Sequence, residues 1–191
     1  MDSASRDRLA AVLTAPGQPL DVREDAAVEL AEAGDRRAFE TLALLLNYRD
    51  ETRAGRAATA LLRLGDPRTG RAAAALATNP LRVGYALPAI RLLVELRAPE
   101  AAAALTTTLR RLLAEGQPGH DRVAVACARG LRTLSAREPL PAAGEEALRA
   151  AAEHPVFRGL LDQEAEPADG HTAARSAATR RSGPSSPRRR R

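Results

Sequence analysis

Few residues of this chain have the type and spacing that catalysis or metal binding requires. The three histidines, His120, His154 and His171, are far apart in the sequence and form none of the paired arrangements that hold zinc. The single cysteine, Cys127, stands in an apolar helical pattern, which indicates a small buried hydrophobe rather than a nucleophile. Glycine-rich phosphate loops and nucleophile-elbow motifs are absent from the sequence. We therefore expect no enzymatic activity, no catalytic residue, no metal and no cofactor.

Arginine is the residue type that offers other chemistry, because it binds anions. The net charge is +5 and all 29 basic residues are arginine. Seven of them lie in residues 171–191, which contain no acid, so this segment alone makes the chain basic. An acid-free arginine run can neutralise phosphates in a salt-dependent way, or it can be an ordinary solvated tail. For contact with a polyanion such as nucleic acid, the candidates are Arg180, Arg181, Arg188, Arg189, Arg190 and Arg191.

The composition favours an all-α fold. Alanine, the best helix former, is abundant, while aromatic residues make up only 2% of the chain. The sequence has no secretory signal and no apolar run of the roughly 18 residues that a membrane span needs. We expect a cytoplasmic protein without a membrane span.

A short motif repeats along the chain. Residues 30–35 (LAEAGD) align with 61–67 (LLRLGDP) and 93–99 (LVELRAP), and a weaker copy lies at 131–134 (LRTL) after a loop at 116–119. Each copy is interpreted as two helices. In the first copy, Asp21 is predicted to cap a helix over 22–33, Gly34 to end it in the left-handed conformation, and Asp35 to cap the second helix. In the second copy, Gly65 and Asp66 repeat this turn.

Two prolines mark helix starts. Pro67 is predicted at the first helical position, where a missing N–H is harmless, and Pro88 should kink the third copy's first helix or delay its start. The resulting organisation is an N-terminal cap helix and loop over 1–19, helical repeats over 20–162, and a disordered arginine-rich tail over 163–191.

Residues 21–46 and 50–76 resemble the HEAT repeat, in particular the short HEAT-like repeat named after phycobilisome lyases. The shared pattern is an early arginine, small residues, a leucine, and Gly-Asp-Pro before the second helix. The resemblance implies a short α-solenoid of about four antiparallel helix pairs with irregular terminal caps, acting as a scaffold that binds a protein partner. An auxiliary nucleic-acid binder that uses the tail is the alternative, and an accessory or vestigial lyase-type module is the third possibility.

Two sets of arginines follow from the repeat. HEAT-like stacks usually bind through their second helices, so the candidate partner contacts, or ordinary solvated charges, are Arg36, Arg37, Arg68, Arg71, Arg110 and Arg111. A second set stands near the start of each first helix, where a cation opposes the helix dipole: Arg23, Arg53, Arg82 and Arg122. We expect turn carboxylates of adjacent copies, Asp35, Asp50 and Asp66, to compensate this second set.

Overall fold

The structure of the chain, a computed structural model, describes residues 1–117, 119–155 and 157, and these residues are helical with no strand. The all-α prediction is thus confirmed, while the predicted tail over 163–191 and its arginines lie outside the described residues. The α-helices are α1 Ser3–Thr14, α2 Leu20–Glu32, α3 Phe39–Leu46, α4 Glu51–Leu64, α5 Thr69–Thr78, α6 Leu87–Leu96, α7 Ala101–Glu115, α8 Asp121–Ser135 and α9 Ala142–Glu153. Two short 3-10 helices are η1 Arg36–Ala38 and η2 Pro80–Tyr85.

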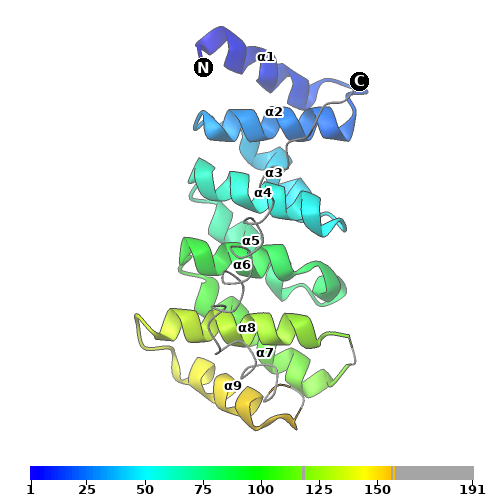
Figure 1. The fold of residues 1–191 in the computed structure, drawn as a ribbon. Helices are drawn as coiled ribbons and strands as arrows, with labels where there is room; N and C mark the ends of the chain where they lie inside the picture. The colour runs from blue at the N-terminus through cyan, green and yellow to red at the C-terminus, as the bar shows by residue number, and fades with distance from the viewer. Residues whose placement is uncertain (118, 156, 158–191) are drawn as a thin grey trace, which may run out of the picture.

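The helices pack against one another in two rows. Helices α2, α4, α6 and α8 lie side by side in chain order, and α3, α5, α7 and α9 contact one another in the same order as a second row. Helix α1 packs on α2 at one end of the molecule, and α9 lies at the other end (Figure 1). We call the first row the first helices and the second row the second helices.

The repeated leucines form the core between the rows. Leu30, Leu61, Leu93 and Leu131 occupy the equivalent position of each copy, and all four side chains are fully buried. Alanines fill much of the remaining core, which lets neighbouring helices approach closely. Burying one leucine side chain stabilises the fold by roughly 1.5–3 kcal/mol. Because each copy buries one such leucine, each copy contributes separately to the stability of the core.

The turns from first to second helices follow the sequence prediction. Gly34 has a φ of 71° and Gly65 a φ of 62°, the left-handed conformation that glycine adopts without strain. Beyond Gly34, the Asp35 N–H donates to the Leu30 carbonyl at 2.9 Å, which satisfies an end carbonyl of α2. In the third copy Arg97 takes the glycine's place with a φ of 50°.

Several predicted helix starts are wrong by a few residues. Helix α2 begins at Leu20 after Pro19, so Asp21 lies inside the first turn instead of capping it. Pro67 lies in the turn before α5, whose first residue is Thr69. The predicted late start of the third copy's first helix is confirmed. Helix α6 follows η2, and Pro88 lies in the first turn of α6. Arg82 consequently belongs to η2 and not to the start of α6.

Candidate partner-binding surfaces

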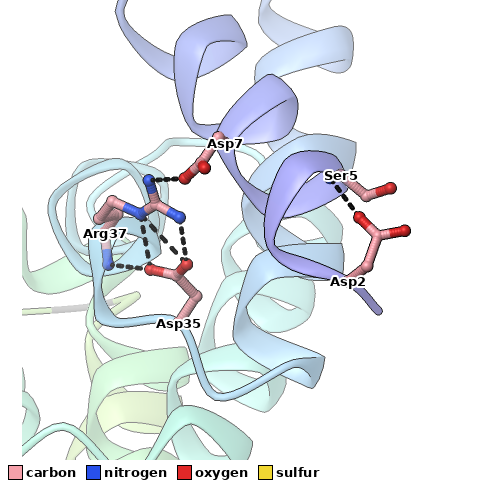
Figure 2. Close-up of polar contacts among 5 residues, drawn as sticks. All are labelled: Asp2, Ser5, Asp7, Asp35 and Arg37. Atoms are coloured by element: carbon pink, nitrogen blue, oxygen red, sulfur yellow. Dashed lines mark hydrogen bonds and ion pairs between the residues drawn. The ribbon is translucent and has the colours of Figure 1, made fainter.

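Arg37 is held by two carboxylates where α2 turns toward α3 (Figure 2). Asp35 accepts a hydrogen bond from the Arg37 backbone N–H at 3.1 Å and binds its guanidinium at 2.6 Å. Arg37 Nη1 also reaches Asp7 of α1 at 2.8 Å. The guanidinium lowers the pKa of Asp35, and hydrogen bonds to Asp35 and Asp7 raise the pKa of Arg37. Arg37 therefore joins the turn to α1.

The same arrangement recurs one copy later. Buried Asp66 accepts from the Arg68 backbone N–H at 2.9 Å and binds Arg68 Nε at 3.0 Å, which lowers the pKa of Asp66. Arg68 Nη1 contacts Glu40 of α3 at 2.8 Å, and the guanidinium lies 3.9 Å from the centre of the Phe39 ring. We call Asp7–Asp35–Arg37 and Glu40–Asp66–Arg68 the two turn clamps.

The six arginines predicted as partner contacts divide into two groups. Arg37 and Arg68 belong to the turn clamps, and Arg111, which is partly buried, donates to the Thr78 carbonyl at 3.1 Å. These three hold parts of the molecule together. The other three are exposed on the surface: Arg36, Arg71 and Arg110.

The arginines near the first-helix starts bind partners other than the predicted turn carboxylates. Arg23 Nη2 donates to the Ala15 carbonyl at 2.9 Å, and Arg82 donates to the Asn47 carbonyl. Ala15 and Asn47 end α1 and α3, where unpaired carbonyls carry partial negative charge. Helix ends thus compensate these two cations.

The remaining two bind glutamates, and the geometry explains why the turn carboxylates are wrong as partners. Arg53 Nε lies 3.1 Å from Glu24, and Arg122 Nη2 lies 3.9 Å from Glu51. Asp35 and Asp66 stand at the opposite end of first helices that are roughly 20 Å long at about 1.5 Å per residue, beyond the reach of these arginines. Asp50 instead caps α4, accepting from the N–H groups of Thr52 and Arg53 at 2.9 and 3.0 Å: its carboxylate is already engaged.

Glu24 is a buried acid between α2 and α4. Its side chain is 2% exposed, and its two oxygens bind Arg53 Nε at 3.1 Å and Arg56 Nη1 at 2.9 Å. Arg56 also reaches the exposed Asp25 at 3.0 Å. Because a buried carboxylate needs such compensation, this cluster is assigned to the packing of α2 on α4 rather than to catalysis.

A group of aromatic, apolar and cationic residues, all exposed except the partly buried Arg82, lies on the loops that lead into α4 and α6. Tyr48 is 44% exposed, Tyr85 is 40% exposed and Leu81 is 90% exposed. The Arg49 guanidinium lies 5.9 Å and that of Arg82 5.3 Å from the centre of the Tyr85 ring. Figure 1 shows both loops on the same side of the molecule. We call these five residues the loop-edge patch.

The outward face of the second helices carries uncharged residues at one set of equivalent positions. Leu44, Ala75 and Thr107 occupy equivalent positions of α3, α5 and α7, and all three are exposed, Leu44 by 73%. Between α7 and α9 this face is hollowed into a groove of about 420 Å³. The groove is lined by Ala103, Thr106, Thr107, Arg110, Pro141, Ala143 and Gly144.

The first helices carry larger grooves of mixed charge. A groove of about 590 Å³ between α6 and α8 has an apolar floor that includes Ile90 and Val125 and a rim with Arg91 and Glu95. A second groove, of about 730 Å³, shares Glu95 and continues toward the α8–α9 loop. Both grooves are lined by positive and negative side chains, which favours no single class of ligand.

The residues that are chemically reactive in principle are poorly placed for chemistry. Cys127 is fully buried, and desolvation raises the pKa of its thiol to about 12, so the thiolate is scarce at neutral pH. His120 and His154 line a cavity of about 210 Å³ in which the His154 ring lies 4.7 Å from that of Phe157. Within the described part of the chain, no group of three histidine, cysteine or acidic side chains is placed to hold a metal ion. His171 lies outside that part.

Sequence reasoning did not single out the loop-edge patch or Glu24. The patch had a visible signal: both tyrosines of the chain lie in loops before first helices, and each has an arginine within three residues. Glu24 gave no signal, because an acid in an amphipathic helix normally belongs to its solvated face.

Comparison of the chain with protein-family models, with curated proteins and with solved structures yields no match in any of the three. The family resemblance of residues 21–46 and 50–76 therefore rests on their sequence pattern alone. Across the helices that the structure describes, none has both the length and the apolar character needed to cross a membrane.

Proposed function

We propose that this chain is a short α-solenoid of about four HEAT-like antiparallel helix pairs that acts as a non-enzymatic adaptor. Two rows of helices that contact mainly their neighbours support this proposal, because such a stack leaves a long second-helix face open to a partner. The partner is a protein, and it packs on this face.

The groove between α7 and α9 is the observation that carries the proposal. Its lining is mostly small or apolar, with Ala103, Ala143 and Gly144 on its walls. Small residues let the side chains of a partner approach the helix backbones closely. Arg110 supplies a guanidinium at the same groove, a group that is enriched in protein interfaces.

The charges on the second-helix face favour a protein over a phosphate chain. At one set of equivalent positions the face has Glu40, Arg71 and Ala103, so the sign of the charge changes from copy to copy. A nucleic-acid groove would repeat positive charge along its length. A mixed protein surface tolerates this alternation.

Site-specific photo-cross-linking in the host cell tests the proposal. With p-benzoylphenylalanine at Thr107, in the groove, we expect one discrete covalent adduct with a protein that mass spectrometry can identify. The matched control carries the same group at Glu29, an exposed position of α2 on the other row. Equal adducts at both positions, or none at Thr107, would show that the groove does not bind a protein.

An auxiliary nucleic-acid binder is the second candidate, and the acid-free arginines of residues 171–191 are the observation that favours it. The test is the fluorescence anisotropy of a labelled DNA duplex with the full chain and with a chain ending at residue 162, across a salt series. Weak, salt-sensitive binding that disappears with the shortened chain identifies a nonspecific polycation. Equal binding by the shortened chain makes the helix-face arginines the nucleic-acid site and contradicts the adaptor proposal.

A further inference from the structure

We propose that the loop-edge patch is a second binding site, distinct from the second-helix groove, and that it takes an acidic peptide segment carrying one apolar side chain. The patch consists of Tyr48 and Arg49 from the loop before α4, and Leu81, Arg82 and Tyr85 from η2. These residues come from neighbouring copies, so the site is formed only when two copies stack.

The patch is held in place by contacts between its two loops, since an arginine of each loop contacts the other loop. Arg82 of η2 donates to the Asn47 carbonyl at the end of α3, and Arg49 lies against the Tyr85 ring. Within η2, the Leu81 N–H donates to Asn79 Oδ1 at 2.9 Å, and the buried side chain of Val83 anchors the segment. A surface ordered in this way binds without first losing loop entropy.

The positive charge of the patch is compensated only in part. Arg49 contacts the uncharged Tyr85 ring. Arg82 contacts that ring and the Asn47 carbonyl, which carries only the partial negative charge of a helix end. Neither guanidinium forms an ion pair with an acid among the residues that the structure describes. Nearby Asp50 accepts from the first N–H groups of α4 instead. Two such cations favour a carboxylate partner.

The apolar part of the ligand follows from Leu81 and the tyrosines. Leu81 is 90% exposed, the highest value among the large apolar side chains of the described residues, and the two tyrosine rings are also open to solvent. Tyrosine and arginine are among the residue types enriched at the energetic centres of protein interfaces. An apolar side chain of the ligand would pack on Leu81 while its neighbouring acids meet Arg49 and Arg82.

Charge and geometry argue against two other occupants. The chain's own residues 171–191 contain seven arginines and no acid, so they have the same sign as the patch. A nucleic acid needs a track of cations, but on the same edge residues 16–19 contain none, and acids stand at Asp21, Glu51 and Asp121. Arg23, Arg53 and Arg122 also lie on this edge, but Arg53 and Arg122 face Glu24 and Glu51, and Arg23 binds the Ala15 carbonyl. Acids thus interrupt the positive charge along the edge, which fits a short acidic segment better than a polyanion.

Selection from a phage-displayed random dodecapeptide library on the immobilised full-length protein tests the proposal. We expect the enriched peptides to place acids beside a leucine or an aromatic residue. Anisotropy titrations of a labelled enriched peptide should then show binding weakened at least about fivefold by Arg49→Gln and by Leu81→Ser. Both positions are exposed, so neither change threatens the fold.

Two matched controls separate this site from the second-helix groove. Arg71→Gln and Leu44→Ser make the same chemical changes at exposed positions of the second-helix face, and both should leave peptide affinity unchanged. Enriched peptides without acids, or an equal loss in the control variants, would overturn the proposal. Binding of labelled oligothymidine that is weakened by the patch variants would also overturn it, because the ligand would then be a nucleic acid. A lower molecular mass of Leu81→Ser than of the wild type in solution would overturn it too, because the patch would then bind a second copy of the chain. Because cross-linking at Thr107 tests the groove, the two proposals can fail independently.

Discussion

In both turn clamps one aspartate has two tasks. Its Oδ1 accepts a backbone N–H at the start of the second helix, and the same carboxylate holds a guanidinium that reaches one copy back along the chain. Asp35 thereby connects to Asp7 through Arg37, and Asp66 connects to Glu40 through Arg68. The lowered pKa of each aspartate is the electrostatic consequence of this contact.

The clamps predict how stability depends on pH. A carboxyl whose pKa is lower in the folded state contributes stability above its unfolded pKa of about 3.9, and this contribution is lost as the pH falls through the folded pKa. In urea titrations from pH 7 to pH 2.5, the unfolding free energy of the wild type should therefore fall in acid. The double variant Asp35→Asn/Asp66→Asn should have a lower free energy at pH 7 and a flatter acid limb.

The control for this experiment is Asp25→Asn, which removes the same charge from an exposed ion pair with Arg56. Its acid limb should follow that of the wild type, because exposed pairs contribute little. Parallel acid limbs for the wild type and the double variant would mean that the clamps do not couple folding to protonation.

At the residue scale, the sequence predicted the glycines and aspartates of the turns but not the role of their arginines. Gly34 and Asp35 carry local signals, since a left-handed φ and a cap each involve only adjacent backbone. Arg37 and Arg68 contact acids that lie 30 and 28 residues earlier in the chain, and their long side chains could equally have pointed into solvent. Nothing local in the sequence distinguishes a guanidinium that bridges two copies from one that is free to meet a partner.

At the scale of elements, close packing depends on where a glycine lacks a Cβ. A Cβ built on Gly70 of α5 would lie 2.9 Å from Ala98 Cβ and 2.7 Å from Glu100 Oε2, both in the turn between α6 and α7. The Glu100 side chain can rotate away, but Ala98 Cβ is fixed to the backbone. A Cβ added to Gly55 of α4, in contrast, would have no heavy atom of a neighbouring residue within 4 Å.

This contrast predicts opposite effects for the same substitution. Gly55→Ala should stabilise the protein by about 0.5–1 kcal/mol, because alanine is the better helix former. Gly70→Ala has the same gain in propensity but forces α5 away from the turn, so it should destabilise by about 1–2 kcal/mol. Thermal and urea unfolding followed by circular dichroism measure both. Stabilisation by both substitutions would show that α5 can move without cost, and destabilisation by Gly55→Ala would contradict the propensity argument.

Element order was more predictable than element boundaries. Leu30, Leu61 and Leu93 marked the repeated copies, and the apolar residues at helical spacing around each of them identified the first helices, since burial of one face imposes the helical period. The start of α2 was misplaced because Asp21 is a good cap by type, whereas the chain already enters the helix after Pro19. The 3-10 helix η2 was missed, because its side-chain cap from Asn79 is a weak local signal.

At the scale of the whole molecule, the core is distributed along the stack. Each copy buries its own leucine, and the first helices contact one another in sequence, α2 with α4, α4 with α6 and α6 with α8. The helices at the two ends, α1 and α9, have neighbours on one side only within the described chain. Stability in such an arrangement is approximately a sum of local terms, so it should be graded from the centre to the ends.

Hydrogen exchange measured by mass spectrometry on the full chain tests this gradient. Amides of α1 and α9 should exchange before those of α4 through α7. Leu61→Ala, which opens a cavity at a fully buried position of α4 and should cost about 2–5 kcal/mol, should lower protection most in α4 and the helices that contact it, α2, α3 and α6. Leu44→Ala, at an exposed position, is the control and should leave the pattern unchanged. An equal loss of protection in every helix would instead mean that the helices unfold as one cooperative unit. All amides would then exchange through global unfolding, and a local defect would lower that single unfolding free energy.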